Sequence, residues 1–175
     1  MKKITIFLFV LTIIFFLTNN NQKVVIPKDS IRFRIIANSN AKEDQLLKWN
    51  ITKKLVPNLD SILNTSSSLD ESRNQIKRNL TNIEKVVKNN TDNYSINYGM
   101  NYFPEKTYND VTYKEGNYES LVITLGDGLG DNFWCVLFPP LCLLEADKDN
   151  IDDITYTTYV KKTLNKFNNL TKNIK

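Results

Sequence analysis

The stretch at residues 126–142 limits how this chain can fold more than any other, because it concentrates residues with unusual backbone properties. It reads GDGLGDNFWCVLFPPLC and holds three of the five glycines, two of the five prolines and both cysteines. Gly126, Gly128 and Gly130 can adopt positive φ angles, so we expect a sharp turn there. The apolar run at 133–138 then predicts a short buried strand.

The strand must stop at Pro139 and Pro140, because proline has no backbone N–H to donate to a sheet. Cys135 and Cys142 flank this stop, and a disulfide between them is one hypothesis. In the chain-entropy model, closing a loop of about eight residues would stabilise the fold by roughly 2–3 kcal/mol.

The N-terminus carries the pattern of an export signal. Lys2 and Lys3 precede an apolar run at 4–17, which as a helix would span roughly 21 Å against a hydrocarbon core of about 30 Å. The polar exit at 18–21 offers no small-x-small cleavage site, so a signal peptide and an uncleaved anchor both remain open for residues 1–18. Export would permit a disulfide, and we expect membrane contact only through this segment.

Composition excludes several classes of function. Without Lys2 and Lys3, 21 basic residues face 19 acidic ones, so we expect no nucleic-acid partner. The chain has no histidine, which removes histidine-based triads and zinc sites. Two cysteines cannot form a four-cysteine metal site, and no G-x-G-x-x-G motif is present. We therefore expect no metal, no cofactor and no recognisable catalytic set.

After a polar linker at 19–30, residues 31–35 alternate between apolar and basic side chains, which predicts a strand. Arg32 and Arg34 share its second face. We expect them to pair with carboxylates of acidic loop residues, because the guanidinium group suits bidentate carboxylate contacts.

Apolar residues at i+4 spacing predict a helix that begins near Asn40, with Asn40 as N-cap and Glu43 in the capping-box position. Pro57 should end or kink this helix. A second amphipathic helix is expected at 69–88. The segment at 154–167 fits a helical face but is also β-rich, so we interpret it as a helix that follows an initial strand.

Period-two alternation predicts further strands at 94–102, 108–113 and 118–125. Strands joined by short turns usually pair antiparallel. The expected fold is α+β: an antiparallel sheet of about four to five strands packed against two to three helices. This single domain should cover residues 31–144, and an acidic linker and an amphipathic segment should follow at 145–175.

Two groups of residues resemble the stage II sporulation protein R family. The N-terminal group is Arg32, Arg34, Asn38, Ser39, Asp44 and Gln45, followed by Lys48. The C-terminal group is Glu119, Gly126, Gly128, Gly130, Asn132, Trp134, Cys135, Pro139, Pro140 and Cys142. The resemblance covers residues 25–142. Asp127, Phe133 and Asn40 depart from it, since the family more often has Glu, Trp and Asp there.

The resemblance implies an exported signalling protein of endospore formers. Family members act in the intermembrane space between forespore and mother cell. There they activate a septal membrane aspartic protease that processes the sigma-E precursor. The resemblance therefore implies that this protease is the partner and that the chain itself is not an enzyme.

Physical reasoning adds a hypothesis about the receptor contact. Aromatic side chains are the usual energetic anchors of an interface. The alternative is that residues 126–142 belong to the core, with alternate residues facing opposite ways. The candidate receptor-binding residues are Asp127, Asn132, Phe133, Trp134, Leu137 and Phe138.

Two other functions remain open from the residues alone. One is an exported cell-envelope enzyme acting through Glu119 and Asp127, since paired carboxylates serve as acid and base in glycosidases. The other is a module that binds the cell wall.

Overall fold

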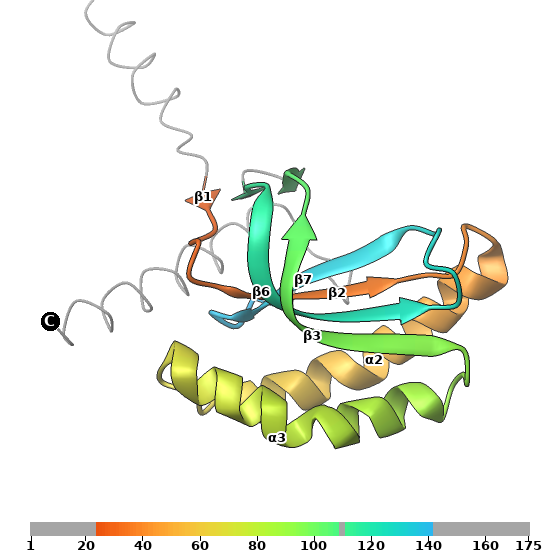
Figure 1. Ribbon diagram of the computed structural model, residues 1–175, viewed down its shortest axis with the longest axis horizontal. Coiled ribbons are helices and arrows are strands. Elements are labelled where there is room, and N and C mark those ends of the chain that lie inside the picture. Colours follow the sequence, from red (N-terminus) through yellow and green to blue (C-terminus); the bar gives the residue numbers. More distant parts are fainter. Residues whose placement is uncertain (1–23, 109–110, 142–175) are drawn as a thin grey trace, which may run out of the picture.

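The computed structural model describes residues 24–108 and 111–141, which form a single α+β domain (Figure 1). The fold class predicted from the sequence is confirmed. In chain order the elements are β1 (Val24–Val25), β2 (Ile31–Ile36), α2 (Lys42–Leu63), α3 (Leu69–Lys88), β3 (Tyr94–Phe103), β4 (Lys106–Tyr108), β5 (Val111–Tyr113), β6 (Gly116–Leu125) and β7 (Asn132–Phe138).

The main sheet has four strands in the order β3-β6-β2-β7. β6 pairs antiparallel with β3, and β7 pairs antiparallel with β2. β2 and β6 pair parallel, so the sheet is mixed and the expectation of a purely antiparallel sheet is corrected. The reason is that α2 and α3 return the chain before β3 begins. After β3 the chain reverses direction, and β6 then lies between β3 and β2, antiparallel to β3 and parallel to β2.

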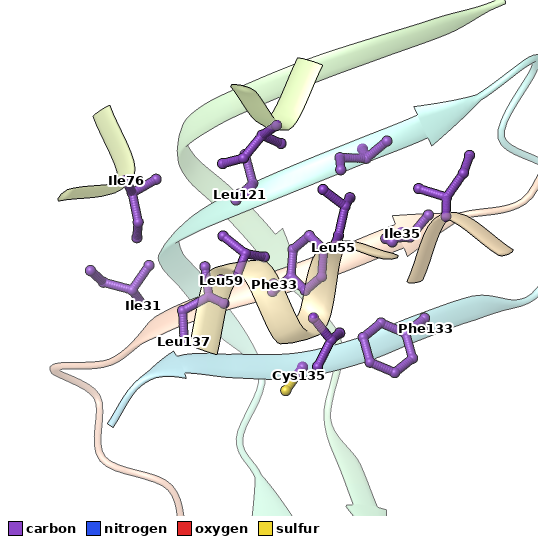
Figure 2. Close-up of a cluster of buried hydrophobic side chains, with 14 of the residues drawn as sticks. Ile31, Phe33, Ile35, Leu55, Leu59, Ile76, Leu121, Phe133, Cys135 and Leu137 are labelled. Atoms are coloured by element: carbon purple, nitrogen blue, oxygen red, sulfur yellow. The ribbon is translucent and has the colours of Figure 1, made fainter. Parts of the chain in front are cut away.

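Both helices cover the same face of this sheet (Figure 1). The core lies between the two layers, where Ile31, Phe33 and Ile35 of β2 are each 0% exposed. They meet Leu55 of α2 and Leu121 of β6 in the cluster drawn in Figure 2. Burying each such side chain contributes roughly 1.5–3 kcal/mol to folding. The alternation of β2 therefore decides which face of the sheet carries the helices.

The first helix differs from its prediction at two points. Ala41 is its N-cap residue and no side chain caps it, so the assignment of Asn40 as N-cap is wrong. Asn40 Oδ1 instead accepts a hydrogen bond from the Asp131 backbone N–H at 2.6 Å. Pro57 lies inside the helix, which continues to Leu63. Packing of the buried helix face on the sheet offsets the roughly 3 kcal/mol cost of an internal proline.

The second helix follows its prediction at 69–88. Ser68 is the N-cap, and its Oγ accepts a hydrogen bond from the Glu71 backbone N–H at 3.2 Å. Glu71 Oε2 in turn accepts from the Ser67 backbone N–H at 2.8 Å. These two bonds satisfy one N–H group that the first helical turn leaves without a partner, that of Glu71, and the N–H of Ser67 just before the cap.

The expected strands at 94–102, 118–125 and 133–138 are confirmed as β3, β6 and β7. The region predicted as one strand at 108–113 belongs to two strands, β4 and β5. With β1 they form a second sheet in the order β1-β5-β4. β1 itself lies within the predicted linker at 19–30.

Several predictions fall on residues that the structure does not describe. They are the signal segment at 1–18, Cys142, and the acidic linker and amphipathic segment at 145–175. Among the described residues, neither helix is both long and apolar enough to cross a membrane.

Candidate functional site

Two loops that are distant in sequence form one structural unit, which we call the loop junction: residues 37–40 after β2 and residues 126–131 after β6. Parallel neighbouring strands end at the same edge of a sheet, so the two loops emerge side by side. The backbone N–H of Leu129 donates to the Asn38 carbonyl oxygen and that of Gly130 to the Ala37 carbonyl oxygen, each at 2.9 Å. The loop junction is therefore held by backbone hydrogen bonds.

Glycines allow this close approach. Gly126 and Gly128 have φ angles of 55° and 67°, in the left-handed region that favours glycine. Gly130 has a different reason, because a Cβ atom there would overlap the backbone carbonyl of Ser39. The predicted glycine turn is present, and the structure adds that the turn packs against the loop after β2.

Asn38 joins the two loops through its side chain. Its Oδ1 accepts a hydrogen bond from the Asp127 backbone N–H at 2.9 Å, across 89 positions of sequence. Its Nδ2 donates to Asp44 Oδ2, also at 2.9 Å. The same carboxylate oxygen accepts from Ser39 Oγ at 2.6 Å. The Ser39 hydroxyl, followed by the Asn38 amide, holds the pKa of Asp44 below its usual value.

The start of α2 is fixed to the loop junction by two further side chains. Gln45 Nε2 donates to the Ser39 carbonyl oxygen at 2.8 Å. Lys48 Nζ donates to Gln45 Oε1 at 2.6 Å and to the Asp131 carbonyl oxygen at 3.0 Å. Lys48 is only 4% exposed, so its ammonium group serves inside the fold. The sequence did not single out Lys48 as a connection to the glycine loop, because the two are remote along the chain.

Glu119 lies at the other end of β6, on the face that carries the helices. Its Oε2 accepts from Arg73 Nε of α3 at 2.7 Å, and its Oε1 accepts from the Tyr98 hydroxyl at 2.8 Å. Burial, reinforced by the Glu119 carboxylate, raises the pKa of Tyr98. Glu119 therefore links α3 to the sheet.

The proposed acid–base pair of Glu119 and Asp127 is not assembled. A strand rises about 3.4 Å per residue, so the part of β6 from Glu119 to Leu125 alone spans roughly 20 Å. Catalytic carboxylates of glycosidases are about 5–10 Å apart. The two groups cannot flank one glycosidic bond.

No carboxylate of the described residues pairs with Arg32 or Arg34, so their predicted contacts with acidic loop residues stay a prediction. The Arg32 guanidinium lies 3.3 Å from the centre of the Tyr118 ring, and one of its NH2 groups donates to the Lys114 carbonyl oxygen at 3.2 Å. The Arg34 guanidinium lies 4.5 Å from the Trp134 ring centre. Arg34 and Trp134 are register partners on β2 and β7, so sheet pairing brings the cation to an aromatic ring.

The candidate receptor-binding residues divide between two faces of the sheet. Phe133, Leu137 and Phe138 are at most 3% exposed and belong to the core, so the expectation that they meet a receptor is corrected. Their strand packs against α2, and Phe133 stacks edge-on against Trp49 at 6.0 Å. Trp134 points to the other face and is half-buried. Receptor contacts by Asp127, Asn132 and Trp134 stay predictions.

Cys135 is buried at 5% exposure, and Pro139 is also buried. Its predicted partner Cys142 lies outside the described residues, so the disulfide stays a prediction.

Leu129 is an exposed apolar residue that the sequence reasoning missed. It lies within the glycine turn and is 80% exposed, although both neighbours on the chain are hydrogen-bonded glycines. A large apolar residue between two turn glycines was the available signal. The loop junction thus presents one apolar side chain on a fixed backbone.

The family described as stage II sporulation protein R matches residues 27–148, which include both halves of the loop junction. The chain belongs to the stage II sporulation protein R family. Stage II sporulation protein R of Bacillus subtilis (strain 168) is 38% identical over 133 residues, which cover 73% of this chain and 59% of that relative. The chain thus matches less than two thirds of the relative's length. No solved structure matches the chain.

Membership confirms the resemblance read from the two sequence groups and establishes a link to sporulation. The family is named for sporulation, and its name is not that of an enzyme class. Within residues 24–108 and 111–141, no three metal-ligating side chains come together.

Proposed function

We propose that this protein is an exported signal of endospore formation that activates a septal membrane aspartic protease, which then processes the sigma-E precursor. The observation that carries the proposal is the loop junction. It unites the two groups of residues by which the chain resembles its family, although Asn38 and Asp127 are 89 positions apart. The corresponding location is the intermembrane space, which the chain reaches through the signal segment at 1–18, and residues 4–17 are the segment that would tether it to the membrane.

The loop junction has two properties that favour binding: a backbone held in place by hydrogen bonds and an exposed apolar side chain. Side chains of Asn38, Asp44 and Lys48 hold the glycine turn in one conformation before any partner arrives. A preorganised loop loses less conformational entropy on binding. Leu129 is exposed at its tip and offers an apolar anchor.

A non-catalytic role is also supported by the separation of Glu119 from Asp127. Glu119 is already engaged by Arg73 and Tyr98. An activator requires a defined surface, which the loop junction provides, and does not require two adjacent carboxylates.

The decisive experiment is co-expression in a non-sporulating host. The protease and its sigma-factor precursor are produced together with the full chain, or with a chain lacking residues 1–18. We expect precursor cleavage only with the exported form. A folded, exported chain that leaves the precursor intact beside a working protease would contradict the proposal and favour a wall-binding protein or an envelope enzyme.

The same assay tests the loop junction as the contact surface. Leu129→Asp should reduce cleavage about tenfold or more, because a charge replaces an apolar anchor. Met100→Asp is the matched control, since Met100 is 67% exposed on β3, away from the loop junction. Equal activity of the two variants, with both folded, would place the contact elsewhere.

A further inference from the structure

The second face of the main sheet carries two arginines. Both described helices lie on the opposite face (Figure 1). Arg32 and Arg34 of β2 point away from those helices, toward Tyr118 and Trp134. We call this surface the arginine face.

The charges of the arginine face are not balanced by the described residues. The ion pairs within 24–108 and 111–141 both belong to Arg73, with Asp70 and Glu119. The Nε atoms of Arg32 and Arg34 are buried and have no hydrogen-bond partner. Aromatic rings attract a guanidinium group but accept its N–H groups poorly. A buried charged donor without an acceptor costs folding free energy. A carboxylate or phosphate oxygen at the guanidinium groups of Arg32 and Arg34 would remove that cost.

A small cavity marks one such position. Arg32, Lys106 and Trp134 help to line it, and no carboxylate does. Arg32 is itself only 1% exposed. The cavity has a volume of about 10 Å³, which suits a single oxygen atom of an acidic group.

The chain leaves the described structure beside this face. The Leu141 backbone N–H donates to the Val136 carbonyl oxygen at 3.0 Å, which holds residue 141 against β7. β7 is the sheet neighbour of β2, about 5 Å away. The acidic segment begins only four residues later, and four extended residues reach about 14 Å. Within residues 145–153 its carboxylates are Glu145, Asp147, Asp149, Asp152 and Asp153.

We propose that the acidic segment, residues 145–153, docks on the arginine face, with its carboxylates on Arg34 and at the cavity beside Arg32. Charge complementarity, chain length and the exit point of the chain all favour this occupant. The family match extends to residue 148, into the acidic segment. The proposal makes the segment part of the folded domain, and it does not depend on the signalling role.

Hydrogen–deuterium exchange on the full chain tests the contact. Backbone amides of residues 145–153 should exchange slowly in the native protein, and about tenfold faster in Arg34→Gln, because charge-assisted hydrogen bonds are lost. Arg78→Gln is the matched control, since Arg78 is an exposed arginine of α3. Fast exchange in the unmodified chain, or equal exchange in the two variants, would overturn the proposal. Protection that depends on protein concentration would also overturn it, by assigning the occupant to a second copy.

A second variant avoids any change to the sheet. Asp149→Asn, Asp152→Asn and Asp153→Asn together remove charge from the acidic segment without altering a described residue. In a Trp49→Phe background, Trp134 is the one tryptophan left, and its ring is stacked on Arg34. Quenching of tryptophan fluorescence by iodide then reports how freely the anion reaches Trp134. The neutralised segment should make quenching by iodide clearly stronger, because the anion then approaches the guanidinium group freely. Unchanged quenching would contradict docking even if Arg34→Gln proved unstable.

Discussion

At the scale of single residues, the loop junction depends on side chains that bond in two directions. Asn38 accepts from the glycine turn and donates to Asp44 on α2. An aspartate at position 38 would lose the donor, and a leucine would lose both bonds. Position 38 therefore requires an amide side chain, which can both accept and donate a hydrogen bond. Position 130 requires glycine, because a Cβ atom there would overlap the Ser39 carbonyl.

Gly130→Ala should destabilise the protein by about 1–3 kcal/mol, because the new methyl group would overlap the Ser39 carbonyl and force the loops apart. Urea unfolding of the full chain measures the change. Gly99→Ala is the control, since a Cβ atom there meets only Asn97 Oδ1 at an ordinary 3.5 Å. Equal loss of stability in both variants would contradict the steric argument.

Asp44 should make the stability of the fold depend on acid. Hydrogen bonds from Ser39 and Asn38 lower its pKa in the folded state. Its contribution is therefore complete above the unfolded pKa of about 4, and it is lost as pH falls through the lower folded value. Asp44→Asn should flatten the fall in urea midpoint below about pH 4. An unchanged slope in this variant would show that other carboxylates dominate.

At the scale of elements, the two helices begin by different means. α3 has a side-chain cap at Ser68, whereas α2 begins at Lys42 without one and is tied through Gln45 and Lys48 to the loop junction. Local sequence signals predicted the start of α3 correctly. They failed for α2 because Asn40, a good N-cap residue, is used by Asp131 of a distant loop.

Ser68→Ala should cost about 1 kcal/mol, because the Glu71 backbone N–H loses its acceptor. Thermal or urea unfolding provides the measurement. Ser61→Ala, at an exposed position inside α2, should be neutral or slightly stabilising, since alanine is the better helix former. Loss of stability in Ser61→Ala but not in Ser68→Ala would contradict the assignment of Ser68 as the N-cap of α3.

At the scale of the whole molecule, β2 is the strand that connects the two halves of the main sheet and separates its two faces. It pairs with β6 and β7, places one face on the helices and presents arginines on the other. The two tryptophans report on these two faces, since Trp49 packs on Phe133 and Trp134 stacks with Arg34. Because the described residues form a single domain, we expect the packing on both faces of the sheet to be lost in one cooperative unfolding transition.

The Trp49→Phe and Trp134→Phe variants should each unfold in one urea transition, with fluorescence coincident with far-UV circular dichroism. Each variant retains a single tryptophan as probe. A fluorescence midpoint that departs from the dichroism midpoint in either variant would show that one face unfolds separately.

Features that depend on neighbours along the chain were readable from the amino-acid sequence. Alternation in residues 31–35 placed Ile31 and Phe33 on the core face. The helix at 69–88 and the glycine turn at 126–130 were likewise readable, since helix starts and turns are set by a few adjacent residues.

The contacts between distant segments became visible only in the folded protein. The parallel pairing of β2 with β6 brought Asn38 to Asp127, and the register of β2 with β7 placed the Trp134 ring beside the Arg34 guanidinium group. The same pairing buried Phe133 and Leu137, although their composition suited an exposed anchor equally well. These outcomes depend on strand order, and strand order follows from how the helices return the chain and bury one face of the sheet.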